Sequence, residues 1–175
     1  MYSEYYKPML PIELLKWVRD NQSILKDKSF LEVGGGKSTS FLSKYFKIVY
    51  TYENNQEYFN LIKKDIQQNN IKNVDLNYFK SELFQNKKFF KLVESCDYIL
   101  IDINNFSRHD LAYFIHNNKK PSSGIILSKG NRNMYAYKFL KDNYYCFDFV
   151  GQDQFGIYCT TLFHTKIDDK SKIFR

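Results

Sequence analysis

The stretch Phe30-Leu31-Glu32-Val33-Gly34-Gly35-Gly36-Lys37-Ser38-Thr39 decides the fold of this chain. A run typical of a buried strand, Phe30 to Val33, leads into three glycines, and a helix-like stretch follows them. Glycines let the backbone turn tightly and let a ligand lie against bare peptide where a helix begins. The pattern therefore predicts a ligand-binding loop between a strand and a helix.

Two phosphate-binding motifs resemble this loop and do not fit it. Residues 36–38 read Gly-Lys-Ser, the end of a P-loop, but that motif needs a glycine five positions before Gly36, where Leu31 stands. A dinucleotide fingerprint needs a third glycine where Thr39 stands. These mismatches argue against a nucleoside triphosphatase and a standard dinucleotide site. The pattern that remains is an acid, Glu32, followed by one spacer residue and Gly-x-Gly at 34–36.

A second acid follows the next strand-like run, 48–52, in the form of Glu53. An acid at the tip of the second strand, roughly 20 residues past the glycines, is placed to accept hydrogen bonds from ribose hydroxyls. Taken alone, Glu53 is equally well explained as an acid at the start of a helix, where the macrodipole favours it. Together with the glycine loop, ribose binding is the favoured interpretation.

Strand-like and helix-like segments alternate from Ser29 onward, which predicts an α/β domain with a doubly wound parallel sheet. The predicted strands are 30–33, 48–52, 74–79, 98–103 and 124–127. Between them, apolar residues recur at helical spacing, with Asn55 as a predicted helix cap and Ser107 with Asp110 as a predicted capping box.

The two ends of the chain depart from this alternation. Residues 144–150 and 157–164 are rich in aromatic and β-branched residues and are joined by the turn-like segment 151–156, which predicts an antiparallel hairpin. Residues 11–21 predict an extra helix with Pro11 in its first turn. We therefore expect an N-terminal segment 1–28 with a cover helix, a domain 29–165 and a charged tail 166–175.

The residues at 32–36, Glu53 and the run 97–102 resemble motifs I, II and IV of the class I S-adenosylmethionine (SAM)-dependent methyltransferases. The resemblance implies a Rossmann-like sheet of seven strands whose last strand is antiparallel, and SAM as cofactor. It implies that the glycines pass under the cofactor, that Glu53 holds the ribose, and that Asp102 faces the methionine end or the substrate. The cofactor-binding residues it implies are Glu32, Gly34, Gly35, Gly36, Glu53, Ser81, Glu82 and Asp102.

Catalytic residues are expected at the carboxyl ends of the fourth and fifth strands, where Asp102, Lys129 and His109 are the leading candidates. Each has a plainer explanation: Asp102 as a loop brace, Lys129 as a surface lysine, and His109 as an exposed residue in the first turn of a helix. Other polar residues in this region are Asn104, Asn105, Asn131, Arg132 and Tyr135. Metal-dependent catechol-type enzymes have an Asp-Asn pair after the fifth strand, and here 127–131 lack the aspartate, so we expect no metal site.

The composition of the chain limits the kinds of partner and the location that we expect for the protein. The net charge is +7 with a pI of about 9.1, but the lysines are scattered, so nucleic acid is a less favoured partner and an acidic methyl acceptor is electrostatically favoured. Three cysteines without CxxC spacing suggest neither disulfides nor zinc. No apolar stretch reaches the ~20 residues of a membrane helix, and 1–10 lack the apolar block of a signal peptide, so we expect a cytoplasmic protein. The oligomeric state is not indicated.

Three classes of function fit these features. The first is a small, metal-independent methyltransferase with a small or acidic acceptor. The second is a catalytically inactive SAM-binding protein or a subunit of a larger assembly, which the missing base and metal motifs favour. The third is aminopropyl transfer, whose enzymes carry an N-terminal β-domain for which this chain has no room.

Overall fold

The computed structural model describes residues 10–81, 83–103, 108–129, 134–153 and 156–164, which form one sheet of seven strands in the order β3-β2-β1-β4-β5-β7-β6. The parallel strands are β1 (Ser29–Val33), β2 (Ile48–Glu53), β3 (Val74–Tyr78), β4 (Tyr98–Ile101) and β5 (Gly124–Leu127). The strand β7 (Gly156–His164) runs antiparallel to both β5 and β6 (Tyr145–Asp153). The predicted doubly wound sheet with a terminal hairpin is confirmed.

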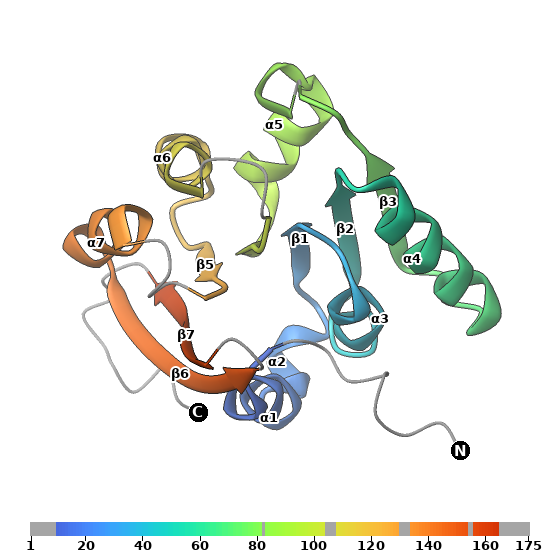
Figure 1. The fold of residues 1–175 in the computed structure, drawn as a ribbon, viewed down its shortest axis with the longest axis horizontal. Coiled ribbons are helices and arrows are strands. Elements are labelled where there is room, and N and C mark those ends of the chain that lie inside the picture. The colour runs from blue at the N-terminus through green and yellow to red at the C-terminus, as the bar shows by residue number, and fades with distance from the viewer. Residues whose placement is uncertain (1–9, 82, 104–107, 130–133, 154–155, 165–175) are drawn as a thin grey trace.

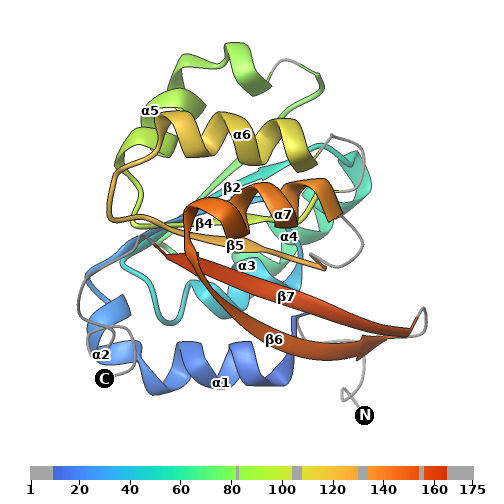
Figure 2. The same ribbon diagram turned by 90° about the vertical axis from the view of Figure 1, so that its left-hand side faces the viewer.

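Helices cover both faces of this sheet (Figures 1 and 2). One layer contains α1 (Ile12–Asp20), α2 (Gln22–Leu25), α3 (Lys37–Leu42) and α4 (Gln56–Gln68). The other contains α5 (Lys87–Ser95), α6 (Arg108–Asn118) and α7 (Met134–Asn143), with a short 3-10 turn, Leu83–Gln85, before α5. Each layer encloses its own apolar core, and the larger one lies between the sheet and α5, α6 and α7.

Local capping explains where two of these helices begin. The side chain of Asn55 accepts hydrogen bonds from the backbone N–H groups of Glu57 (2.9 Å) and Tyr58 (3.1 Å), which confirms the predicted cap of α4. Asn86, which was not among the predicted caps, caps α5 in the same way. Ser107, the predicted cap of α6, lies outside the described residues.

The terminal hairpin is longer than predicted. The sequence predicts a turn at 151–156, but β6 continues to Asp153 and pairs without a break from Tyr145↔His164 to Asp153↔Gly156. Gly151 fits inside the strand because a Cβ there would lie 2.6 Å from the ring of Tyr158, so this glycine serves close packing rather than a turn. Two other strands end early, β3 at Tyr78 and β4 at Ile101.

The predicted N-terminal helix is present as α1, although Pro11 stands just before it as the capping residue. The buried residues Leu14, Leu15 and Val18 hold α1 against one face of the sheet. The Trp17 ring lies 6.2 Å from that of Tyr98 and 6.5 Å from that of Phe149. The helix α1 therefore covers a face of the sheet rather than the ends of the strands, because its apolar side chains pack against that face. Among the described residues, no helix has the length and apolarity needed to span a membrane.

Candidate functional site

The strand order reverses direction at β1, which lies between β2 and β4. The helix after β1, α3, and the helix after β4, α6, lie on opposite faces of the sheet (Figure 1). In doubly wound sheets, ligands bind in the crevice that such a reversal opens at the carboxyl ends of the strands. Glu32 lies next to the last residue of β1, Glu53 ends β2, and the three glycines and Asp102 follow β1 and β4, so the structure brings these predicted residues to the carboxyl ends of neighbouring strands.

Gly34 occupies a position that only glycine can fill. Its φ is +94°, and a Cβ on it would lie 2.0 Å from the backbone oxygen of Asp102. Its N–H donates a hydrogen bond to the Tyr52 oxygen (2.8 Å), and the Asp102 N–H donates to the Val33 oxygen (2.8 Å). The glycine loop is thus packed directly against the loop after β4.

The other two glycines have different surroundings. A Cβ on Gly35 would lie 2.5 Å from Cγ2 of Thr51 and 2.8 Å from Cδ1 of Ile62, so the protein itself fills the space beside it. A Cβ on Gly36 would meet no atom closer than the Ser38 hydroxyl at 3.9 Å. Of the three glycines, Gly36 is therefore the one with room beside its backbone.

Glu32 lies beneath the loop and is fully buried. Its carboxylate accepts hydrogen bonds from the hydroxyls of Ser38 (2.5 Å), Thr39 (2.5 Å) and Thr51 (2.9 Å). Burial raises the pKa of Glu32 from 4.5 to about 7, against the opposing effect of these three donors. Its described contacts tie β1, β2 and α3 together, so Glu32 acts as a brace of the loop.

Glu53 ends β2 and is only 5% exposed. Its Oε1 accepts a hydrogen bond from the Asn55 N–H at 2.6 Å. Burial raises the pKa of Glu53, and the backbone N–H groups of Asn55, Gly35 and Asn54 oppose that rise. A carboxylate offers about four acceptor positions, so Glu53 keeps capacity for a ligand hydroxyl beyond these backbone donors.

Asp102 lies where the loops after β4 and β5 meet, with its side chain 25% exposed. Its Oδ1 lies 3.4 Å from the guanidinium of Arg108, the first residue of α6. The fully buried hydroxyl of Ser128 faces the same carboxylate but makes no hydrogen bond of ordinary geometry. Burial raises the pKa of Asp102, while the charges of Arg108 and Lys129 and the Ser128 hydroxyl oppose the rise.

Lys129 is brought to the same corner by an unusual backbone conformation, with φ of +54°. Its N–H donates to the hydroxyl of Thr160 at 3.4 Å, and its ammonium lies 5.4 Å from the centre of the Tyr158 ring. Both partners belong to β7, which pairs with β5 only from Thr161 onward. The hairpin therefore extends past the end of β5 and positions Lys129 near Asp102.

The other predicted site residues are not gathered here. The His109 ring packs on Phe139 of α7 at 5.8 Å and lies 3.7 Å from Asp110, so its described contacts are on the helix layer. Ser81 is exposed after the end of β3, and Tyr135 is 79% exposed on α7. The remaining candidates, Glu82, Asn104, Asn105, Asn131 and Arg132, lie outside the described residues.

Sequence reasoning missed Arg108 and the hydroxyls that hold Glu32. The signal for Arg108 was present, because positions 108, 111, 112 and 115 have the spacing of one helix face and the last three are apolar. A residue on that face is buried even when it is charged. Ser38, Thr39 and Thr51 carry no comparable signal, since their contact with Glu32 depends on how the glycine loop turns.

Within the part of the chain that the structure describes, no three histidine, cysteine or acidic side chains are grouped as a metal site would require. The three cysteines are free thiols, with Cys96 buried and Cys146 and Cys159 half-buried. The run 97–102, which resembles one family motif, contains two acids at opposite ends of β4, because Asp97 precedes this strand and Asp102 follows it. Asp97 lies at the amino end of β4, where it binds Ser29, Lys28 and Lys120.

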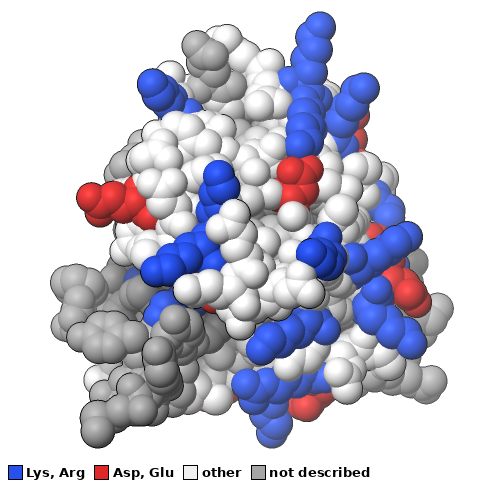
Figure 3. Space-filling model, turned by 90° about the vertical axis from the view of Figure 1, so that its right-hand side faces the viewer, with Lys and Arg blue, Asp and Glu red and all other residues white. Residues whose placement is uncertain are grey.

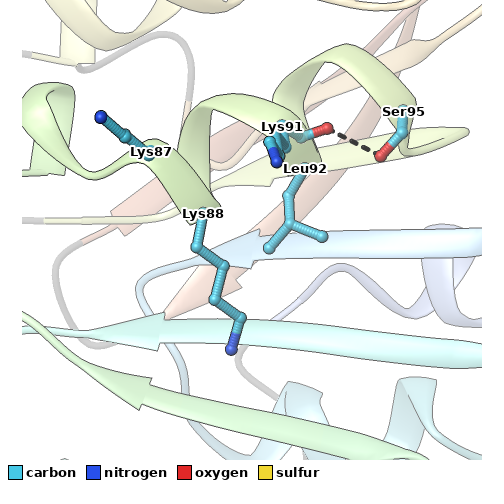
Figure 4. Close-up of a pocket in the computed structure, with 5 residues that line it drawn as sticks. All are labelled: Lys87, Lys88, Lys91, Leu92 and Ser95. Carbon is cyan, nitrogen blue, oxygen red and sulfur yellow. Dashed lines mark hydrogen bonds between the residues drawn. The ribbon is translucent and has the colours of Figure 1, made fainter.

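Many lysines among the described residues are exposed at the surface. On the face that includes α4 and α5, Figure 3 shows lysines spread over the surface with acidic residues between them. A shallow depression on α5 is lined by Lys87, Lys88, Lys91, Leu92 and Ser95 (Figure 4). Lys88 pairs with Asp75 (2.8 Å) and Asn77 (2.9 Å) of β3. This depression is separate from the glycine loop, and nucleic-acid binding stays a less favoured prediction.

Comparison with known proteins gives matches in structure alone. No family model and no curated protein matches the sequence. An O-methyltransferase from Bacillus cereus in complex with SAH (S-adenosylhomocysteine) superposes with a TM-score of 0.72 at 17% identity, covering 93% of this chain and 84% of that one. An O-methyltransferase from Streptomyces achromogenes in complex with SAM gives 0.68 at 11%, covering 87% and 79%. A precorrin-6y C5,15-methyltransferase from Geobacter metallireducens gives 0.67 at 16%, covering 86% and 88%.

These likenesses, with the strand order and the glycine loop at the reversal point, define the class of structure. The chain has the Rossmann-like fold of the class I SAM-dependent methyltransferases, and the resemblance of residues 32–36 and Glu53 to that superfamily agrees with it.

Proposed function

We propose that this protein binds S-adenosylmethionine in the crevice at the carboxyl ends of β1, β2 and β4 and transfers its methyl group to an acceptor. The observation that carries the proposal is the loop itself. Gly34 is held at positive φ against Asp102, Gly36 has open space beside it, and Glu53 stands at the tip of the next strand. Structures with this fold in complex with SAM and SAH support the choice of cofactor.

The residues at this edge fit the chemistry of that cofactor. Glu53 keeps acceptor capacity for ribose hydroxyls, and the Gly36 backbone can approach a ligand because no side chain intervenes. Bound SAM would supply the reactive methyl carbon on a sulfonium. Glu53 and Asp102 supply two carboxyl groups that can lie against the cationic part of the ligand, while Lys129 acts on Asp102 from the loop after β5.

We further propose that the acceptor is small or acidic and that transfer is independent of a metal ion. The support is the corner after β5, where Lys129 stands beside Asp102 in a segment without the aspartate of the metal-dependent enzymes. An ammonium held there attracts an acidic group of the acceptor. Once an acceptor is found, EDTA is expected to leave the turnover unchanged, and a rate restored only by magnesium would contradict metal independence.

Calorimetric titration with SAM and SAH tests cofactor binding directly. We expect a dissociation constant on the order of 1 μM, which corresponds to about −8 kcal/mol. The Glu53→Ala variant is expected to bind both ligands more weakly by about 1 to 3 kcal/mol, because the ribose hydroxyls lose their acceptor.

The matched control is Glu57→Ala, which removes an exposed acid from the first turn of α4 and should leave both affinities unchanged. An unmodified protein that binds neither ligand would refute the proposed function.

A further inference from the structure

Arg108 stands where neither burial nor helix geometry favours a positive charge. Its side chain is 6% exposed, and it is the first residue of α6, where the helix macrodipole disfavours cations. Burying a guanidinium removes strong interactions with water, which must be replaced inside the protein. An apolar residue would complete the same helix face without this cost.

The guanidinium recovers these interactions by joining two loops. Its Nε donates to the Ile103 oxygen at 2.7 Å, and its two terminal nitrogens donate to the Ser128 oxygen and to Oδ1 of Asp102. Asp102 and Ile103 follow β4, whereas Ser128 follows β5, and the two strands are hydrogen-bonded neighbours. One side chain therefore connects the two strand ends beside the proposed site.

The same contact leaves Asp102 available to a ligand. Arg108 reaches Oδ1 in the described contacts, and the carboxylate remains 25% exposed. The other charged groups that act on it are Lys129, which opposes its protonation, and Glu53 and Glu32, whose own pKa values the Asp102 charge raises. The carboxyl group of Asp102 thus lies among two cations and two further acids.

We propose that Arg108 is the positioning residue of this site, which fixes the Asp102 carboxylate between the β4 and β5 loops and keeps it ionised toward the methionine end of the cofactor. The role toward the cofactor rests on the proposed function, whereas the effect of Arg108 on Asp102 does not. SAM carries one positive charge more than SAH, so an ionised Asp102 near the sulfonium favours SAM over SAH.

The first arm of the test needs no cofactor. Carbon-13 NMR of the carboxyl groups gives the titration midpoint of Asp102, whose signal is assigned by its loss in Asp102→Asn. In Arg108→Gln the midpoint is expected to move to higher pH, because the opposing charge is gone while burial remains. Arg108→Lys is expected to shift it in the same direction by less, because lysine keeps the positive charge but lacks the planar fork that directs separate N–H groups to the two loops.

The control is Arg19→Gln, which removes an exposed arginine of α1 and should leave the Asp102 midpoint where it was. A role confined to packing would lower the melting temperature of the Arg108 variants without moving the midpoint. An Asp102 midpoint that is unchanged in the folded Arg108 variants would overturn the proposal, and Arg108→Lys alone decides if Arg108→Gln does not fold.

The second arm measures the affinities for SAM and SAH by calorimetry across the pH range of that titration. The preference for SAM is expected to fall as pH drops through the Asp102 midpoint, and in Arg108→Gln to fall at a higher pH. In the Asp102→Asn background, Arg108→Gln should leave the preference unchanged, and a remaining change would contradict action through Asp102. If the parent binds neither ligand, the proposed function fails while the NMR arm still decides the role of Arg108.

Discussion

The glycines of the loop differ in how strongly an alanine substitution is expected to lower the free energy of unfolding. Gly34→Ala puts a Cβ against the Asp102 backbone at a positive φ, so we expect a loss of more than about 2 kcal/mol in the free energy of unfolding. Gly36→Ala is the matched variant, because the backbone at Gly36 is extended and its nearest atom is 3.9 Å away.

The pair separates folding from binding. Thermal unfolding should show Gly34→Ala destabilised and Gly36→Ala close to the parent, whereas calorimetry should show weaker SAM binding by folded Gly36→Ala. Parental affinity in Gly36→Ala would mean that the space beside this glycine does not serve the cofactor.

Glu32 makes the stability of the protein depend on pH. Its folded pKa of about 7 lies above the ordinary value of 4.5, so between these values the folded state holds a proton that the unfolded state releases. The stabilisation is therefore complete below pH 4.5 and is lost as pH rises through 7, by up to about 3 kcal/mol.

Denaturant unfolding at several pH values checks this dependence. Glu32→Gln keeps the shape of the side chain and cannot ionise, so its stability should vary less between pH 4.5 and 7 than that of the parent. Equal slopes for the two proteins over this window would show that Glu32 does not titrate as its burial implies.

At the scale of elements, Asp97 joins the amino ends of β1 and β4, which lie at the side of the sheet opposite the proposed site. It accepts hydrogen bonds from the Ser29 N–H (3.0 Å) and hydroxyl (2.9 Å) and from Lys120 (2.8 Å), which joins β1 and β4 to the loop before β5. Although burial works in the opposite direction, these donors and Lys28 lower its pKa from 3.8 to about 2.

A lowered acid pKa gives stability that is present above pH 3.8 and is lost as pH falls through 2. Asp97→Asn is therefore expected to unfold with about 1 to 2 kcal/mol less free energy at pH 7. The difference from the parent should shrink toward pH 2. The exposed Asp142→Asn serves as control, and a constant difference at all pH values would point to lost packing instead of lost charge.

The sequence pattern predicted the strands and helices well where the apolar residues follow the spacing of the element that buries them. The parallel strands are short apolar runs and the helices between them repeat at 3.6 residues, so their order along the chain was predictable. The hairpin length was not, because Gly151 and Gly156 resemble turn residues, and only the ring of Tyr158 shows why Gly151 belongs inside a strand. The helix α2 has four residues and carries too little periodicity to be predicted.

For the whole molecule, the resemblance supplied part of what the pattern could not. The resemblance implied seven strands with an antiparallel last strand, but alternating strands and helices do not fix the strand order, so the reversal at β1 that opens the crevice is known from the structure alone. The sequence predicted that the glycines, Glu53, Asp102 and Lys129 lie together, and the structure places them at the carboxyl ends of the strands, while their role in binding stays a prediction. Arg108 was missed because a charged side chain is ordinarily exposed, and His109 was included because sequence gives no direction for its ring.

The proposed function predicts where on the protein the cofactor binds. A crystal structure of the protein grown with SAH tests this prediction most directly. We expect SAH to lie over residues 34–36, with its ribose hydroxyls within 3.2 Å of the Glu53 carboxylate, the upper limit of an ordinary hydrogen bond. SAH bound only elsewhere, such as in the lysine-lined depression on α5, or a site that stays empty at saturating SAH, would contradict the account.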